Sequence, residues 1–345
     1  MSHETASPEP GLERAGLAAA LAPQWRIPLG MLALACLAIG IVTAREWGEM
    51  IHQWWNIDTY NHILLVPPII SWLVWLKAEA LARMTPRLFL PGLALVAAGL
   101  ALWLTGRISG INLLAHAGAV GAVQGVVVAM LGVRIAAFLA LPIAFAAFLV
   151  PFGDEIIPAL QSITAQIAIA LTLWSGIPAV IDGIFIDTPV GLFIVAEACS
   201  GVKFLVAMVT LAVLVCFTRF QSWRRRALFV AASVIVPVLA NGVRAWGTIY
   251  IAQFAGVEFA AGFDHIFYGW IFFALVVIII LAGAWRFFES EPEDYGPSED
   301  CVNASAHIAQ LERGPAASGA GLGAVAALSV AAAIAAAIFA PAAPF

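Results

Sequence analysis

The sequence predicts an all-α polytopic membrane protein, because of its composition and the lengths of its apolar runs. Hydrophobic residues make up 63% of the 345 residues and charged residues 11%, and the mean hydropathy is +0.98, which does not fit a water-soluble domain. The apolar residues gather into runs of about the 20 residues that a helix needs to cross a bilayer. Only short loops remain between these runs, so no large soluble domain is expected.

Eight of the runs form the expected membrane core of residues 27–285, and a ninth follows near the C-terminus. The runs cover residues 27–44, 61–76, 88–104, 111–131, 135–150, 200–217, 227–249, 266–285 and 321–340. Residues 1–26 are polar and have neither the h-region nor the cleavage site of a signal peptide, so we expect a cytoplasmic tail and a retained first helix. Residues 286–320 are expected to form an acidic cytoplasmic linker, and residues 321–345 hold the ninth helix.

Basic loops set the expected orientation, because Lys and Arg near helix ends stay on the cytoplasmic side. The marked loops contain Lys77, Arg83 and Arg87 and, later, Arg219 and Arg224–Arg226. A crossing by residues 156–174 would set these two loops on opposite sides of the membrane. We therefore expect that segment to lie as a helix on the outer membrane interface. Polar positions within it permit this placement, namely Gln161, Ser162, Thr164 and Gln166.

On this assignment, residues 151–199 form one extracytoplasmic unit. The stretch Ile184–Val195 alternates turn residues with β-branched and aromatic residues, a pattern that predicts a β-hairpin. It leads straight into Cys199. A hairpin in this place can hold an extended substrate by strand addition, or it can simply cover the helix ends, and the sequence leaves both roles open.

Cys199 lies where this strand-like run ends and a long apolar helix begins. The unpaired N–H groups and the positive end of the helix dipole favour the thiolate, the nucleophilic form of cysteine. Ser200 is a candidate cap for that helix, with Cys199 just outside it. The alternative is a small buried cysteine, a common fate of this residue type. The four cysteines of the chain show no zinc-ligand spacing, and neither a metal nor another cofactor is expected.

Arg244 is a basic side chain within an expected spanning helix. It lies three residues after Asn241, on the same face of the last two turns of the run 227–249. A guanidinium inside a membrane helix is energetically costly, so it normally faces protein or a water-filled cavity and indicates a function. The alternative is that Arg244 extends to the lipid phosphates. Asn241 beside it favours an internal site.

His265 is expected at the outer mouth of the next helix. Asp264 is a plausible N-cap there and can orient the imidazole. Together the three segments bring a thiol, a guanidinium and an imidazole to one membrane face. These are the nucleophile, the oxyanion-stabilising charge and the proton carrier that acyl transfer needs. His62, at the outer end of the second helix, either joins this site or anchors the interface, and anchoring is favoured.

The motifs of this chain resemble those of the exosortase family, most closely the exosortase A group. They are Ala196-Glu197-Ala198-Cys199-Ser200-Gly201, Asn241-Gly242-Val243-Arg244, His265 with Gly269-Trp270, and Asn61-His62-Ile63-Leu64-Leu65-Val66-Pro67. The resemblance covers roughly residues 30–290, and all the motifs occur in order. The chain departs from the pattern at Ile63, where glycine is common, and at Lys203, where arginine is common.

The resemblance implies a cysteine transpeptidase or protease of the bacterial inner membrane, with its active site on the periplasmic face. It implies catalytic roles for Cys199, Arg244 and His265, and supporting roles for Glu197, Ser200, Asn241 and Asp264. The implied partners are membrane lipid and exported proteins that end in a Pro-Glu-Pro motif, a hydrophobic helix and a basic tail (PEP-CTERM proteins). An extracytoplasmic accessory protein is a further candidate partner. Some members have an extracytoplasmic accessory domain fused after the eight-helix core, and of such a domain this chain has at most the anchor, the ninth helix. No nucleic-acid partner is expected.

Two other classes of function remain open at this stage. A transporter, or a component of exopolysaccharide export, would need polar residues that continue through the bilayer. The main candidates are Asn112, His116 and Gln124 in the fourth helix, and they do not reach the cytoplasmic side as a chain. A purely structural scaffold would tolerate loss of the Cys199 thiol.

Overall fold

The computed structural model of the protein describes residues 23–263, 271–312 and 320–339. It confirms the predicted class, an all-α polytopic membrane protein with few strands. In the described part of the chain, seven helices are long and apolar enough to cross a membrane, or eight if one bent pair counts as a single span. The chain forms two compact units. Of the described residues, unit 1 contains 23–56, 63–151, 292–312 and 320–339, and unit 2 contains 57–62, 152–263 and 271–291.

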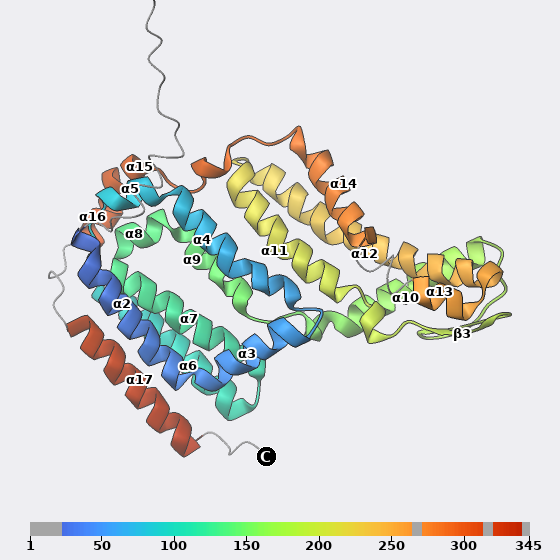
Figure 1. Cartoon of the computed structure of the whole chain (residues 1–345), viewed down its shortest axis with the longest axis horizontal. Coiled ribbons are helices and arrows are strands. Elements are labelled where there is room, and N and C mark those ends of the chain that lie inside the picture. Colours follow the sequence, from blue (N-terminus) through green and yellow to red (C-terminus); the bar gives the residue numbers. More distant parts are fainter. Residues whose placement is uncertain (1–22, 264–270, 313–319, 340–345) are drawn as a thin grey trace, which may run out of the picture. The chain divides into compact units, whose positions relative to one another are not determined.

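Unit 1 is built around two closely packed helices, α6 (Leu93–Ser109) and α7 (Asn112–Leu131). Glycines allow the close approach, because a Cβ added to Gly118 would lie 2.1 Å from the backbone nitrogen of Trp103. Two further helices, α2 (Pro23–Val42) and α17 (Ala320–Phe339), complete this core, and α17 lies along α2 in Figure 1. The expected ninth helix is thus present, with Val325 fully buried in the core.

Two parts of unit 1 differ from the sequence-based expectations. The run 135–150, expected to form one span, is broken into α8 (Val133–Phe138), α9 (Ala140–Phe145) and the 3₁₀ turn η3 (Ala146–Leu149). Pro142 has no N–H to donate to the carbonyl of Phe138, which accounts for the break. The amphipathic helix α3 (Ala44–Asn56) was not expected, and it meets the segment Asn61–Leu76 at a bend of 105°.

That segment consists of η1 (Asn61–Leu65) and α4 (Val66–Leu76), and it is followed by α5 (Ala78–Arg83) and the turn η2 (Leu90–Gly92). The acidic linker is more structured than expected, with η7 (Pro292–Asp294), α15 (Glu299–Ala304) and α16 (Ala306–Leu311). Ion pairs hold it to the rest of unit 1: Arg83 with Glu299 (3.0 Å) and Arg134 with Glu312 (2.6 Å).

Unit 2 contains residues 152–199, which the sequence analysis expects on the extracytoplasmic side. Its helices are α10 (Ile157–Trp174), preceded by the turn η4 (Asp154–Ile156), then α11 (Val202–Arg219), α12 (Trp223–Ala255), α13 (Val257–Phe263) and α14 (Phe273–Trp285). α12 has 33 residues and extends beyond the expected run at both ends. In Figure 1, α10, the sheet and α13 gather around its C-terminal half.

The predicted hairpin is present as two antiparallel strands, β2 (Phe185–Thr188) and β3 (Gly191–Ile194), with Thr188 opposite Gly191. A third strand, β1 (Val180–Asp182), pairs with β2 and was not expected. The sheet order is β1-β2-β3. Ile186 and Val195 contribute to a small core with Ala168 of α10 and Ile249 of α12.

α10 meets the length and composition of a membrane span, counted from Asp154 to Trp174. The sequence analysis based an interfacial helix on four polar side chains, and only two of these are exposed. Ser162 and Gln166 are exposed, but Thr164 is 1% exposed and, like Gln161, bonds within unit 2. The interfacial placement of residues 156–174 stays a prediction.

Candidate active site

Cys199 ends a 3₁₀ turn, η5 (Glu197–Cys199), just before α11 begins at Val202. The turn is closed by the N–H of Cys199, which donates to the carbonyl oxygen of Ala196 (2.8 Å). Cys199 therefore lies just outside the helix, as predicted. Gly201, and not Ser200, occupies the N-cap position, although the Oγ of Ser200 accepts a hydrogen bond from the N–H of Val202 (3.4 Å).

Gly201 is required where it stands for two reasons. Its φ of +83° lies in the left-handed region that favours glycine. A Cβ at this position would also lie 2.7 Å from the Cγ of Asn241. The missing side chain lets the loop after Cys199 approach α12 closely.

Asn241 fixes that approach. Its side-chain amide donates to the carbonyl oxygen of Cys199 (2.8 Å) and to the Oγ1 of Thr164 (3.0 Å). Thr164 in turn donates to the carbonyl oxygen of Ser200 (3.4 Å). Both side chains are buried, with 3% of Asn241 and 1% of Thr164 exposed. The turn that holds Cys199 is thus bonded to α10 and α12 at once.

A cavity of about 70 Å³ lies beside this turn. It is lined by Phe193, Ile194 and Val195 from β3, by Cys199, and by Asn241, Arg244, Ala245, Thr248 and Ile249 from α12. This is far below the range of about 300–1,000 Å³ that is typical of ligand sites. A small reacting group fits, whereas a longer peptide would have to lie outside or displace lining side chains.

Arg244 faces the same cavity as Cys199, and its side chain is buried, with 8% exposed. The guanidinium carbon lies 5.8 Å from the ring centre of Phe204 on α11, within the range of a cation–π contact. This burial favours the internal site over extension to lipid phosphates. A guanidinium beside a thiol is chemically suited to stabilise an anion that forms there.

Of the remaining predicted site residues that the structure describes, Glu197, Ser200 and His62 do not line this cavity. Glu197 is exposed, and its backbone carbonyl accepts from the N–H of Ser200 (3.0 Å). His62 lies in η1, with its Nδ1 3.0 Å from the carbonyl oxygen of Thr59. Asp264 and His265 lie outside the described residues, between the end of α13 and the start of α14.

Sequence reasoning missed the part that Thr164 and Gln161 play. The Nε2 of Gln161 donates to the carbonyl oxygen of Val195 (2.6 Å), so α10 also holds the end of the hairpin. The two residues are three positions apart on one helix face, a spacing at which side chains act together. The spacing of these two residues was the signal in the sequence that they act together. The sequence analysis instead interpreted them as polar positions of a helix at the membrane interface.

The fold and the site define a polytopic membrane protein with a thiol and a buried guanidinium in one small cavity. Residues 54–282 match the model of the transmembrane exosortase family. Because the match covers about two thirds of the chain, the protein belongs to the transmembrane exosortase family, a family of membrane protein-sorting transpeptidases. No curated protein and no solved structure matches the chain.

Proposed function

We propose that this exosortase is a cysteine transpeptidase or protease that cleaves the C-terminal sorting signals of exported proteins, with Cys199 as the nucleophile. The observation that supports this most directly is that Cys199 and Arg244, from different segments of unit 2, line one cavity. The proposed substrates are PEP-CTERM proteins, and the proposed site is the periplasmic face of the bacterial inner membrane.

In the proposed reaction, the Cys199 thiolate attacks the carbonyl carbon of the scissile peptide bond and forms a carbon–sulfur bond. Arg244 stabilises the negative charge on the carbonyl oxygen. The carbon–nitrogen bond then breaks, and His265 gives a proton to the leaving amine. An incoming amine or water gives a proton to His265, attacks the thioester and releases the Cys199 thiolate. The two half-reactions imply ping-pong kinetics.

The transporter alternative would need polar side chains that are free to form a path. In unit 1, two of the three candidates bond within the protein instead. The Nε2 of His116 lies 3.3 Å from a carboxylate oxygen of Glu49, and the amide of Gln124 donates to the carbonyl oxygen of Ile143 (2.6 Å). These contacts favour a structural role for both residues, so export remains the less favoured function.

The test is whether cells that carry Cys199→Ala still process a PEP-CTERM protein, as measured by immunoblotting of that protein. We expect processing to stop, whereas Cys301→Ala, which removes an exposed thiol in unit 1, should process normally. Purified enzyme incubated with substrate should also give a hydroxylamine-sensitive adduct that requires Cys199. Normal processing by Cys199→Ala would remove the enzymatic proposal.

A further inference from the structure

Unit 1 contains a cavity of about 710 Å³, within the range of about 300–1,000 Å³ that is typical of ligand sites. Its walls come from α2, from the segment that joins α5 to α6, from the end of α7 and from α16. None of its lining residues belongs to the Cys199 site or to the short motifs that carry the resemblance to the exosortase family. We propose that this cavity binds an anionic phospholipid of the cytoplasmic leaflet.

The segment that forms one wall is held by its backbone. The N–H groups of Arg87 and Phe89 donate to the carbonyl oxygens of Leu131 (3.2 Å) and Ala129 (2.8 Å). These carbonyls belong to the last turn of α7 and have no partner within the helix. At Gly132, with a φ of +92°, an added Cβ would lie 2.4 Å from the carbonyl oxygen of Arg87. The wall is therefore preformed and does not depend on a ligand.

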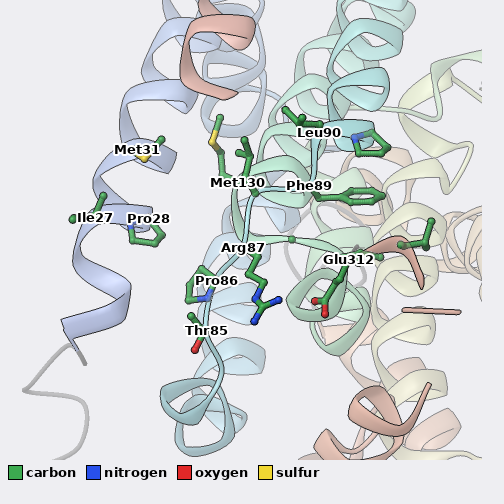
Figure 2. A pocket seen from close by; sticks show the side chains of 15 residues that line it. Ile27, Pro28, Met31, Thr85, Pro86, Arg87, Phe89, Leu90, Met130 and Glu312 are labelled. Atoms are coloured by element: carbon green, nitrogen blue, oxygen red, sulfur yellow. The ribbon is translucent and has the colours of Figure 1, made fainter. Parts of the chain in front are cut away.

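The lining divides into a polar and an apolar end, as Figure 2 shows. Arg87, Thr85 and Glu312 lie in the lower part of that view. Met31 of α2, Met130 of α7 and Leu90 lie in the upper part. A ligand that fills both ends must join a polar group to an apolar chain.

The polar end has a net positive charge. Glu312 is neutralised by Arg134, whose guanidinium contacts the carboxylate at 2.6 Å and, through Nε, at 3.1 Å. Arg87 has an exposed side chain and no ion-pair partner among the residues that the structure describes. An arginine in this state suits a phosphate group, which its planar guanidinium binds through two parallel hydrogen bonds.

The two ends also have the orientation that a phospholipid needs. The polar end lies beside the first turns of α2, which the cytoplasmic tail precedes, and Arg87 belongs to a basic loop expected on the cytoplasmic side. The apolar end lies further along α2, toward the expected bilayer interior. Basic pockets between membrane helices on the cytoplasmic side are suited to anionic headgroups. Free inorganic phosphate would leave the apolar end empty.

The experiment compares lipids retained by the full-length protein after purification and exchange into mixed micelles. The two probes are phosphatidylglycerol and phosphatidylcholine with identical acyl chains, and native mass spectrometry counts the bound molecules. We expect the wild type to retain phosphatidylglycerol preferentially. Arg87→Gln should weaken that retention about tenfold, because hydrogen bonds between charged groups contribute well above the average. Met31→Trp, which fills the apolar end, should weaken retention of both lipids at this site.

Two matched variants serve as controls. Arg83→Gln removes a nearby arginine, the last residue of α5, that is paired with Glu79 and Glu299, and it should keep the preference. Leu34→Trp adds the same bulk to α2 at a side chain that is 56% exposed and outside the cavity, and it should bind as the wild type does. A thermal unfolding midpoint equal to that of the wild type, in mixed micelles that contain phosphatidylcholine, shows that each variant is folded.

Three results would overturn the proposal. Equal retention of the two lipids by the wild type would indicate ordinary annular lipid. Equal losses in Arg87→Gln and Arg83→Gln would indicate a general surface charge effect. If inorganic phosphate protects the protein against heating as well as phosphatidylglycerol does, and Met31→Trp binds normally, the site takes free phosphate. None of these results depends on whether Cys199 is catalytic.

Discussion

The side-chain amide of Asn241 donates a hydrogen bond to the backbone carbonyl of Cys199 over 2.8 Å. The two residues are 42 positions apart in the sequence, and this bond ties the end of the 3₁₀ turn to the middle of α12. The side chain of Cys199 is thereby positioned through its own backbone, in the cavity that Arg244 also lines.

Asn241→Leu should therefore reduce both stability and processing. The substitution leaves the carbonyl of Cys199 and the hydroxyl of Thr164 without this donor, and a buried polar group left unsatisfied costs about 1–3 kcal/mol. Thermal unfolding in detergent and substrate immunoblots measure the two effects. Thr164→Val should give a smaller loss of both, and Thr164→Ser, which keeps the hydroxyl, should restore most of the activity. A fully active Asn241→Leu would show that the bond is dispensable.

Gly201→Ala should be more destabilising than Gly176→Ala in the same unit. Both glycines have a positive φ, +83° and +77°, so alanine is strained at each by about 1–2 kcal/mol. Only Gly201 has a neighbour at 2.7 Å, the Cγ of Asn241, whereas nothing lies within 4 Å of a Cβ at Gly176. Unfolding midpoints of the two variants provide the comparison. Equal midpoints would mean that the loop moves away from Asn241 without cost.

Arg244→Lys should lower processing at least tenfold while expression stays normal. An ammonium keeps the positive charge but lacks the fixed planar fork of donors. Quantified immunoblots over time measure the rate of processing. Lys203→Arg, which exchanges one cation for another at a residue outside the cavity lining, should process as the wild type does. If Arg244→Lys were fully active, charge alone would account for the role of this residue.

The stability of unit 2 should fall at acid pH in a way that depends on Glu289. The N–H groups of Ser222 (2.8 Å) and Gln221 (2.7 Å) donate to its carboxylate, and these bonds, with the charge of Arg225, hold the pKa of Glu289 below its ordinary value. A lowered pKa stabilises the fold above the ordinary value of about 4.3. This stabilisation is lost as the pH falls through the lowered pKa.

Unfolding midpoints between about pH 3 and pH 7, a range that brackets the ordinary glutamate pKa of about 4.3, measure this dependence. Glu289→Gln should be less stable than the wild type at pH 7, with the difference shrinking toward pH 3. A difference that stays constant over the whole range would show that the charge of Glu289 plays no part.

Cysteine labelling tests the expected orientation. In a background without native cysteines, Val190→Cys, at the turn between β2 and β3, should react with a membrane-impermeant thiol reagent from the outside. Ser222→Cys, at the start of α12, should react only after the cells are opened. Labelling of Ser222→Cys from the outside would overturn the expected helix count and with it the interfacial placement of residues 156–174.

Much of the fold could be predicted because composition and turn chemistry are local signals. The hairpin was predictable from Pro189 and the alternating residues around it, whereas β1 has three residues and pairs with β2 without such a pattern. α3 was missed because its charged residues keep it out of any search for apolar runs. The break at Pro142 was a local signal that was overlooked.

The site could be predicted only as a set of residue types. Cys199 and Arg244 were identified from their positions at a helix entrance and inside a spanning helix, and they do share a cavity. The bond between Asn241 and Thr164 joins positions 77 residues apart, and no periodicity within one sequence shows such a pair. The same holds for the contribution of Phe193 and Thr248 to the cavity wall.

In the expected orientation, the length of α12 determines how far the candidate site stands from the cytoplasmic surface. Arg244 follows Trp223 by 21 residues in one continuous helix, a rise of about 32 Å at 1.5 Å per residue. This is close to the hydrocarbon thickness of about 30 Å. A bilayer that α12 crosses along its axis would therefore have the cavity near one border and the basic end of α12 near the other. A substrate helix whose basic tail is anchored at the inner border would place its scissile bond at the cavity if that bond lies one membrane thickness from the tail. Under the proposed function, substrates would be selected by the length of their helix, because four inserted residues would move the bond about 6 Å from Cys199.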